Sequence, residues 1–220
     1  MKGVFEDNYK HKGMRKALVR KVKEKGIHDR QVLEAIEKLP RHYFFEPAFL
    51  EHAYQDKAFP IGSGQTISQP YTVAFQTQQL EVKPGHRILE VGTGSGYQAS
   101  ILLELGVELY TIEYQKPLFE QARWMLRELG YTRVQCFHGD GSLGLPAHAP
   151  YHGIIVTAGA PTVPKALVSQ LAVGGRLIIP VGDNKKQKMI RLTRVSETQV
   201  RKEEYDHFSF VPLRGEQGWK

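Results

Sequence analysis

The chain has 220 residues, a formal net charge of +7 and a hydrophobic fraction of 41%, which suits one domain with a real core. No apolar stretch approaches the roughly 20 residues that a membrane span needs, and the first residues lack the apolar segment of a secretory signal. The single Cys136 excludes an intrachain disulfide, so we expect a reducing, cytoplasmic setting without a membrane partner.

The basic excess is concentrated at the N-terminus, where residues 1–30 contain ten lysines and arginines against four acidic residues. Within this stretch Met14, Leu18 and Val22 recur every fourth residue, which predicts an amphipathic helix over residues 12–25. A solvated basic helix is the simplest interpretation, and a site for an acidic partner is the alternative. Because the rest of the chain is nearly neutral, we expect no nucleic-acid partner.

A second helix and a long irregular segment follow. Asp29 is expected to cap the helix, which Pro40 ends. Residues 40–72 are rich in proline, glycine and aromatic side chains, a composition that argues against disorder. Irregular segments of this length are usually functional, so we predict a binding loop or lid. The chain is therefore divided into a helical and substrate-binding segment, residues 1–72, and a second part, residues 73–220, which together form one compact unit.

Short apolar strands then alternate with helices. Helices are predicted over residues 72–80, 97–105, 117–129 and 164–171, and strands over residues 87–92, 107–113, 134–138, 154–157, 176–181, 189–195 and 208–213. This alternation predicts an α/β fold: a doubly wound, mostly parallel sheet with helices on both faces. The last two strands lack an intervening helix, so we expect the sheet to end antiparallel.

The first of these strands runs into a glycine-rich turn that contains Gly92, Gly94 and Gly96. The fingerprint of dinucleotide-binding folds is G-x-G-x-x-G, but Tyr97 stands where its third glycine belongs, which disfavours a nicotinamide oxidoreductase. Glu90 precedes the turn, where a carboxylate would repel a pyrophosphate. It would suit S-adenosylmethionine, which carries an ammonium and a sulfonium group. The turn therefore favours S-adenosylmethionine as the ligand.

Acidic residues end or follow the next two strands. Glu113 ends one strand, 21 residues after Gly92, where a carboxylate can accept hydrogen bonds from ribose hydroxyls. Asp140 follows the third strand and is expected either to accept the adenine amine or to form an Asx turn. Because strand ends of a parallel sheet meet at one edge, this concordance predicts a class I S-adenosylmethionine-dependent methyltransferase with a Rossmann-like fold.

Over roughly residues 14–215 the chain resembles the protein-L-isoaspartate O-methyltransferases. The most specific motif is G-Q-T-I-S-x-P at residues 64–70, and Glu46 is a departure, since the family usually has valine there. The resemblance implies a carboxyl methyltransferase that uses S-adenosylmethionine, acts on isoaspartyl-containing peptides and proteins, and initiates their repair through a succinimide. We expect a monomer, although the sequence itself does not give the oligomeric state. The implied catalytic residue is Ser68, whose hydroxyl would bind the substrate carboxylate, and Ile61 and Val211 would contact the peptide. The expected cofactor-binding residues are Gln65, Thr66, Ile67, Ser68, Glu90, Gly92, Thr93, Gly94, Gly96, Glu113, Asp140 and Gly141.

Two other functions stay open from the sequence. A methyltransferase acting on RNA would explain the basic helix and would bind RNA with a strong salt dependence. A binding domain that has lost catalysis would bind S-adenosylmethionine without turnover. No metal site is expected, because Pro150 separates His148 from His152 and no zinc-type motif is present.

Overall fold

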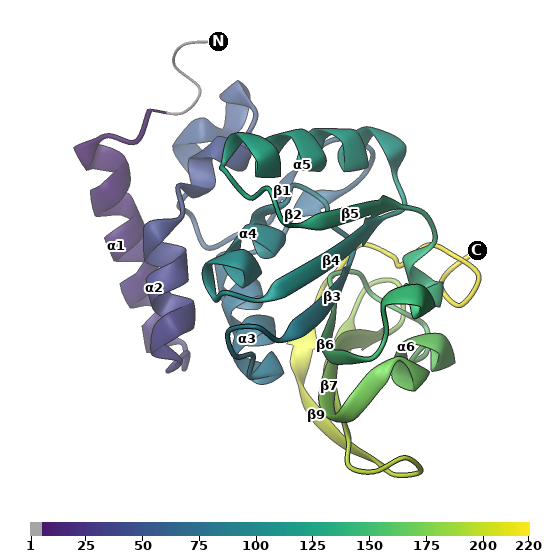
Figure 1. The fold of residues 1–220 in the computed structure, drawn as a ribbon. Helices are drawn as coiled ribbons and strands as arrows, with labels where there is room; N and C mark the ends of the chain where they lie inside the picture. The colour runs from purple at the N-terminus through teal and green to yellow at the C-terminus, as the bar shows by residue number, and fades with distance from the viewer. Residues whose placement is uncertain (1–5) are drawn as a thin grey trace.

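Strands and helices alternate along the computed structural model, which describes residues 6–220 (Figure 1). The helices are α1 (Tyr9–Glu24), α2 (Arg30–Lys38), α3 (Pro70–Leu80), α4 (Tyr97–Glu104), α5 (Lys116–Glu128) and α6 (Lys165–Ser169). The strands are β1 (Phe59–Pro60), β2 (Thr66–Ile67), β3 (Arg87–Val91), β4 (Glu108–Glu113), β5 (Gln135–His138), β6 (Tyr151–Val156), β7 (Leu171–Gly182), β8 (Gln187–Arg194) and β9 (Val200–Phe208). Among residues 6–220, no helix combines the length and the apolar composition needed to cross a membrane.

Seven strands form one sheet in the order β5-β4-β3-β6-β7-β8-β9. The neighbours from β5 to β7 are parallel, whereas β8 is antiparallel to both β7 and β9, which confirms a mostly parallel sheet with an antiparallel end. The chain moves outward from β3 through β4 and β5 and then crosses back to β6 on the other side. At such a switch point, α/β sheets bind ligands beyond the carboxyl ends of the strands.

Both faces of the sheet are covered, as the near-continuous apolar character of its central strands predicts. Successive side chains point to opposite faces. Ile88 and Ile155 belong to the core beneath α3, α4 and α5, and Leu89 and Ile154 belong to a second core beneath α6. All four are fully buried, and each such side chain contributes about 1.5–3 kcal/mol of burial free energy. The predicted α/β architecture with helices on both faces is therefore confirmed.

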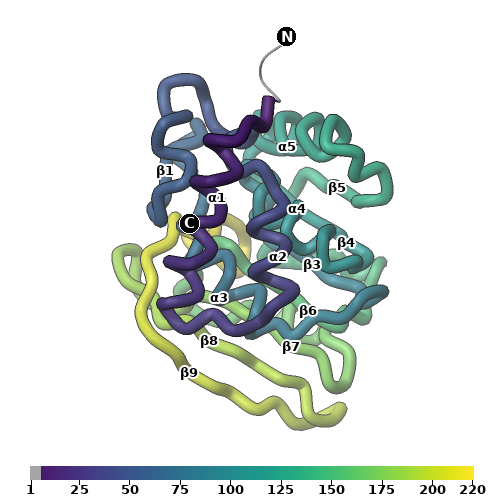
Figure 2. Tube along the Cα trace, turned by 90° about the vertical axis from the view of Figure 1, so that its left-hand side faces the viewer, coloured from purple at the N-terminus to yellow at the C-terminus, as the bar shows by residue number. Residues whose placement is uncertain are grey.

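The first two helices form an outer layer over α3 and α4 (Figure 2). Asp29 caps α2 as predicted, since its Oδ1 accepts hydrogen bonds from the backbone N–H groups of Gln31 and Val32. Leu18 of α1 and Ile36 of α2 are buried in the same core as the apolar residues of α3 and α4. The N-terminal segment thus shares its core with the sheet-containing part, and the cationic side chains of α1 lie mostly on its solvent side.

The segment over residues 40–72 has more local structure than expected. It contains two 3-10 helices, η1 (Arg41–Phe44) and η2 (Pro47–His52), and its strands β1 and β2 pair antiparallel. None of these elements is long enough to show a hydrophobic period. Asp56 fixes the segment, because its buried carboxylate forms an ion pair with Lys25 at 2.5 Å and accepts the backbone N–H of Tyr71 at 2.8 Å.

The prediction of a last strand over residues 208–213 was wrong, since β9 ends at Phe208. The chain then follows the segment after β6: the backbone N–H of Gly159 donates to the Val211 carbonyl oxygen at 2.8 Å, and that of Leu213 donates to the Gly159 carbonyl oxygen at 2.8 Å. Apolar residues around 210 are therefore not an extra strand of the sheet. They border the carboxyl end of β6, beside the switch point.

Candidate active site

The glycine turn after β3 is held in a conformation that only glycine adopts easily. Gly92, Gly94 and Gly96 have φ angles of 95°, 54° and 86°. A Cβ atom added at Gly92 would lie 2.5 Å from Oγ1 of Thr157, the residue after β6. That hydroxyl donates to the Gly92 carbonyl oxygen at 2.6 Å. The turn is therefore packed tightly against the end of β6.

Glu113 ends β4 beside this turn and is only 5% exposed. Its Oε2 accepts the backbone N–H of Gly94 at 2.9 Å, and its Oε1 accepts that of Gln115 at 2.8 Å. A carboxylate oxygen can accept more than one hydrogen bond, so both oxygens retain capacity for a ligand. Glu113 thus orients the turn and presents acceptors at the strand ends.

Ser68 lies between β2 and α3, in the G-Q-T-I-S-x-P segment. Pro70 begins α3, a position where its missing N–H costs nothing, and β2 pairs with β1 just before Ser68. The Ser68 carbonyl oxygen accepts a hydrogen bond from Nη2 of Arg41 at 2.8 Å. The backbone of Ser68 is therefore fixed by a contact from η1.

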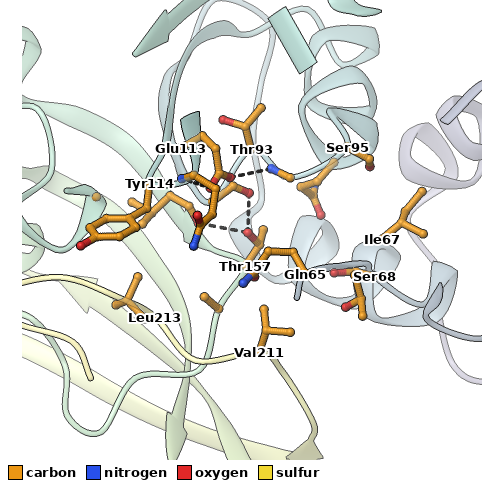
Figure 3. A pocket seen from close by; sticks show the side chains of 18 of the residues that line it. Gln65, Ile67, Ser68, Thr93, Ser95, Glu113, Tyr114, Thr157, Val211 and Leu213 are labelled. Carbon is orange, nitrogen blue, oxygen red and sulfur yellow. Dashed lines mark hydrogen bonds between the residues drawn. The ribbon is translucent and has the colours of Figure 1, made fainter. Parts of the chain in front are cut away.

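Two adjoining cavities share Ser68 in their linings, and Figure 3 shows the deeper one. The deep cavity lies over the strand ends and is lined by Gln65, Thr66, Ile67, Ser68, Val73, Val91, Gly92, Thr93, Gly94, Ser95, Tyr97, Gln98, Ile112, Glu113, Tyr114, Gln115, Gly141, Thr157, Ala158, Val211, Pro212, Leu213 and Arg214. The adjoining groove is lined by Lys25, Ala58, Thr66, Ser68, Gln69, Tyr71, Thr72, Thr157, Asn184, Lys185, Lys186, Asp206, His207, Phe208, Ser209, Phe210, Val211 and Pro212. Thr66, Ser68, Thr157, Val211 and Pro212 line both, so the groove adjoins the deep cavity beside Ser68.

Most of the residues expected at the site from the sequence are brought together here. Those that line the deep cavity are Gln65, Thr66, Ile67, Ser68, Gly92, Thr93, Gly94, Glu113, Gly141 and Val211. Four expected residues do not line either cavity: Ile61, Glu90, Gly96 and Asp140. Their contacts show what holds each of them elsewhere.

Glu90 is fully buried beneath the glycine turn instead of facing a ligand. Its Oε2 accepts a hydrogen bond from the Thr111 hydroxyl at 2.5 Å, and the Thr111 and Thr93 hydroxyl oxygens are 2.6 Å apart. Burial raises the pKa of Glu90 to about 8, so the side chain is mainly a neutral acid at pH 7. Glu90 therefore reaches the cavity only through Thr93 and supplies no full charge there.

This burial predicts an unusual pH dependence of stability. The Glu90 pKa is about 8 in the folded chain against an ordinary value of 4.5, so folding takes up a proton between these two pH values. The contribution of Glu90 to the free energy of unfolding is therefore largest below pH 4.5. It falls as the pH rises to about 8, by at most about 1.4 kcal/mol per pH unit. Glu90→Gln should remove this loss and unfold less readily than the wild type near pH 8.

Denaturant unfolding at several pH values measures this difference. The exposed Glu120→Gln on α5 is the matched control and should keep the wild-type pH dependence. Equal pH dependence in Glu90→Gln and wild type would contradict the buried neutral acid.

The other three residues have packing roles. The Asp140 carboxylate accepts hydrogen bonds from the Ser142 N–H and hydroxyl through Oδ1 and from the Glu216 N–H through Oδ2, so it ties the C-terminal segment to the site. The sequence left two roles open for this carboxylate, accepting the adenine amine or forming an Asx turn. The structure shows the Asx turn, in which Oδ1 accepts the Ser142 N–H. A Cβ at Gly96 would contact α5, and Ile61 is buried behind Gly94.

Several cavity residues were not anticipated. Thr157 follows β6 at the same edge as Glu113, and the rule that ligands bind beyond strand ends would have identified it. Tyr114 and Gln115 continue directly from Glu113 and also line the deep cavity. Leu213 and Arg214 reach the cavity only because the segment after β9 returns past Gly159, and no local pattern indicates that path.

One group outside the cavities has the residue types of a metal site. Asp7, His11 and His42 place their ligand atoms within 4.8 Å of one another. However, Arg15 binds both carboxylate oxygens of Asp7, at 2.6 and 2.8 Å. The His42 nitrogens are also engaged, one with the Tyr54 hydroxyl and one with a backbone carbonyl oxygen. These contacts make the group an ion-pair and hydrogen-bond network that anchors the start of α1.

Comparison with known proteins gives one consistent result. Residues 13–218 match the family model described as protein-L-isoaspartate(D-aspartate) O-methyltransferase. A protein-L-isoaspartate O-methyltransferase of Cytophaga hutchinsonii is 60% identical over 215 residues, which cover 98% of this chain and 97% of the relative. One of Flavobacterium psychrophilum is 53% identical and covers 95% of this chain and 98% of its own length.

Solved structures agree with this match. A protein-L-isoaspartate O-methyltransferase with 27% sequence identity superposes with a TM-score of 0.83, covering 93% of this chain and 67% of the other. A Plasmodium falciparum structure, described as a beta-aspartate methyltransferase in complex with S-adenosyl-L-homocysteine, superposes with a TM-score of 0.79 at 24% identity, covering 95% and 99% of the two chains. At 24% identity, the likeness to the Plasmodium falciparum structure shows the fold alone.

Proposed function

The chain belongs to the protein-L-isoaspartate(D-aspartate) O-methyltransferase family, and we propose that it methylates the free α-carboxylate of L-isoaspartyl residues. The methyl donor is S-adenosylmethionine, and the acceptors are damaged peptides and proteins. The observation that carries this proposal is the position of Ser68 where the groove opens into the deep cavity. A peptide in the groove can present a carboxylate there to a methyl donor in the cavity.

The deep cavity has the features that S-adenosylmethionine requires. Gly92 and Gly94 line the cavity without side chains, so a ligand can approach the backbone of the turn. Glu113 supplies acceptors for the two ribose hydroxyls. Gly141, Ile112 and Leu213 offer a small and largely apolar surface for the adenine. When bound, the cofactor supplies a methyl group activated by a sulfonium.

The substrate brings its own nucleophile, because a carboxyl group is ionised at neutral pH. The residues of the deep cavity would hold the methyl donor, which would supply its methyl group to a carboxylate oxygen and would keep the electron pair of the broken carbon–sulfur bond on sulfur. No proton has to be removed, so a general base is not needed. Ser68 donates a hydrogen bond to the carboxylate and aims one oxygen at the methyl group. The chain therefore acts mainly through proximity, orientation and exclusion of water.

The groove selects the substrate by shape. The segment after β9 lines it with Val211 and Pro212, and Phe208 and Phe210 add apolar surface. The carboxylate of a normal aspartyl residue is displaced by one methylene from that of isoaspartate relative to the peptide backbone. With the backbone fixed in the groove, the normal carboxylate misses the alignment at Ser68.

We further propose that the enzyme is a monomer acting in the cytoplasm, in keeping with its single, partly buried Cys136.

Mass spectrometry of an isoaspartyl peptide incubated with the enzyme and S-adenosylmethionine tests the reaction sequence. We expect a methyl ester first, then a succinimide as the neighbouring backbone nitrogen displaces methanol, and then a mixture of aspartyl and isoaspartyl peptides. The same peptide containing L-aspartate is the control and should stay unmodified. Esterification of both peptides at equal rates would contradict the proposed selectivity.

A further inference from the structure

Arg41 is a fully buried cation that forms no ion pair within 4.0 Å among residues 6–220, although the more distant Asp56 carboxylate interacts favourably with its charge. Its Nε donates to the carbonyl oxygen of Ala53 at 3.0 Å, and its Nη2 donates to that of Ser68 at 2.8 Å. Within the same part of the chain, its Nη1 has no hydrogen-bond partner. Burying a guanidinium costs free energy that two neutral carbonyl groups offset only in part. An apolar side chain of similar volume would serve stability at least as well, so the cation needs another explanation.

The same guanidinium is packed against aromatic rings. Its central carbon lies 4.5 Å from the centre of the Tyr97 ring and 5.3 Å from that of Phe45. Tyr97 is the first residue of α4, directly after the glycine turn, and it lines the deep cavity. The planar Arg41 side chain therefore links three parts of the chain. These are the backbone of Ser68, Ala53 directly after η2, and α4 directly after the glycine turn.

We propose that Arg41 is a positioning residue for methyl transfer, which sets the Ser68 hydroxyl relative to the cofactor turn. This inference rests on the proposed function. The fork geometry is essential: two nitrogens of one rigid plane hold two carbonyl oxygens while the central carbon lies over the Tyr97 ring. A lysine carries the same charge but has no plane to stack and no fixed fork. Arg41 itself does not line either cavity, so it acts through Ser68 and Tyr97.

A double-mutant cycle with Ser68 tests the proposal. Arg41→Lys and Arg41→Met should each lower kcat by about 10- to 100-fold, as small displacements of reacting groups do, with little change in the binding of S-adenosylhomocysteine measured by calorimetry. In the Ser68→Ala background, the same two substitutions should lower kcat by less than about threefold, because the hydroxyl that they misplace is already absent.

Arg15→Met is the matched control. Arg15 is also a buried arginine of the N-terminal part, held by Asp7, Tyr54 and the Glu37 carbonyl oxygen, with no contact to Ser68. It should lower the unfolding midpoint while kcat stays at the wild-type value. Wild-type kcat in both Arg41 variants, or full losses that multiply with that of Ser68→Ala, would overturn the proposal. Failure of the proposed function would differ, since the wild type itself would then not methylate the isoaspartyl peptide.

Discussion

Ser68→Ala should lower kcat on an isoaspartyl peptide by about 100-fold or more, the usual loss when one positioned hydrogen-bond donor is removed from a reacting group. The hydroxyl belongs to a segment that lines both the deep cavity and the groove, just before α3. The substitution removes one oxygen and leaves the backbone contact with Arg41 in place. We therefore expect nearly unchanged affinity for S-adenosylhomocysteine in a calorimetric titration.

Ser63→Gly provides the control within the same loop. Ser63 is exposed and has a φ of 50°, a conformation that glycine adopts without strain. Removing this hydroxyl should leave kcat and cofactor affinity as they are. A Ser68→Ala enzyme that turns over at the wild-type rate would show that the substrate carboxylate is held by another group.

Glu113→Ala should weaken cofactor binding by about 100-fold or more. The carboxylate accepts backbone N–H groups from Gly94 and Gln115 and is expected to accept the ribose hydroxyls as well. Hydrogen bonds to a charged group contribute about 1.5–3 kcal/mol each, and every 1.4 kcal/mol is a factor of ten in affinity. Glu113→Gln should also bind weakly, because its amide NH₂ would face an N–H donor. Titration with S-adenosylhomocysteine measures both variants.

Glu108→Ala on the same strand separates this effect from a general disturbance of β4. Glu108 begins the strand at the end remote from the cavity, where its carboxylate is exposed and accepts a hydrogen bond from the Tyr110 hydroxyl. We expect wild-type cofactor affinity in this variant. Unchanged affinity in Glu113→Ala would instead assign the ribose contact to a different residue.

The central architecture follows from local sequence patterns. The buried parallel strands appear as short apolar runs, because both of their faces are covered, and Gly26, Gly106 and Gly130 follow the ends of α1, α4 and α5. The last strand was misplaced because β9 lacks such an apolar run. β9 lies at the sheet edge, and its charged residues Lys202, Glu203 and Glu204 form ion pairs. Only Tyr205 and Phe208 of this strand pack on Phe75 of α3, so its apolar pattern is weak, whereas the apolar stretch after it lines the groove.

The site residues that can be predicted from the sequence are those placed in the site by their strand end alone. Glu113 and the glycine turn lie at the carboxyl edge, as parallel strands require. Glu90 and Asp140 also stand near strand ends, but their side chains do not line the cavity. Glu90 is in register with Thr111, two residues before Glu113 on the same face of the sheet, so its side chain lies beneath the glycine turn. Asp140 is engaged by Glu216, 76 residues away, a contact that only the tertiary fold creates.

The most direct test of the central claim is transfer of a labelled methyl group from S-adenosylmethionine to two peptides that differ only in one residue, L-isoaspartate or L-aspartate. We predict label on the isoaspartyl peptide alone, and its release by mild base, as a carboxyl ester requires. Label on neither peptide, with cofactor binding demonstrated in the same preparation, would contradict the account.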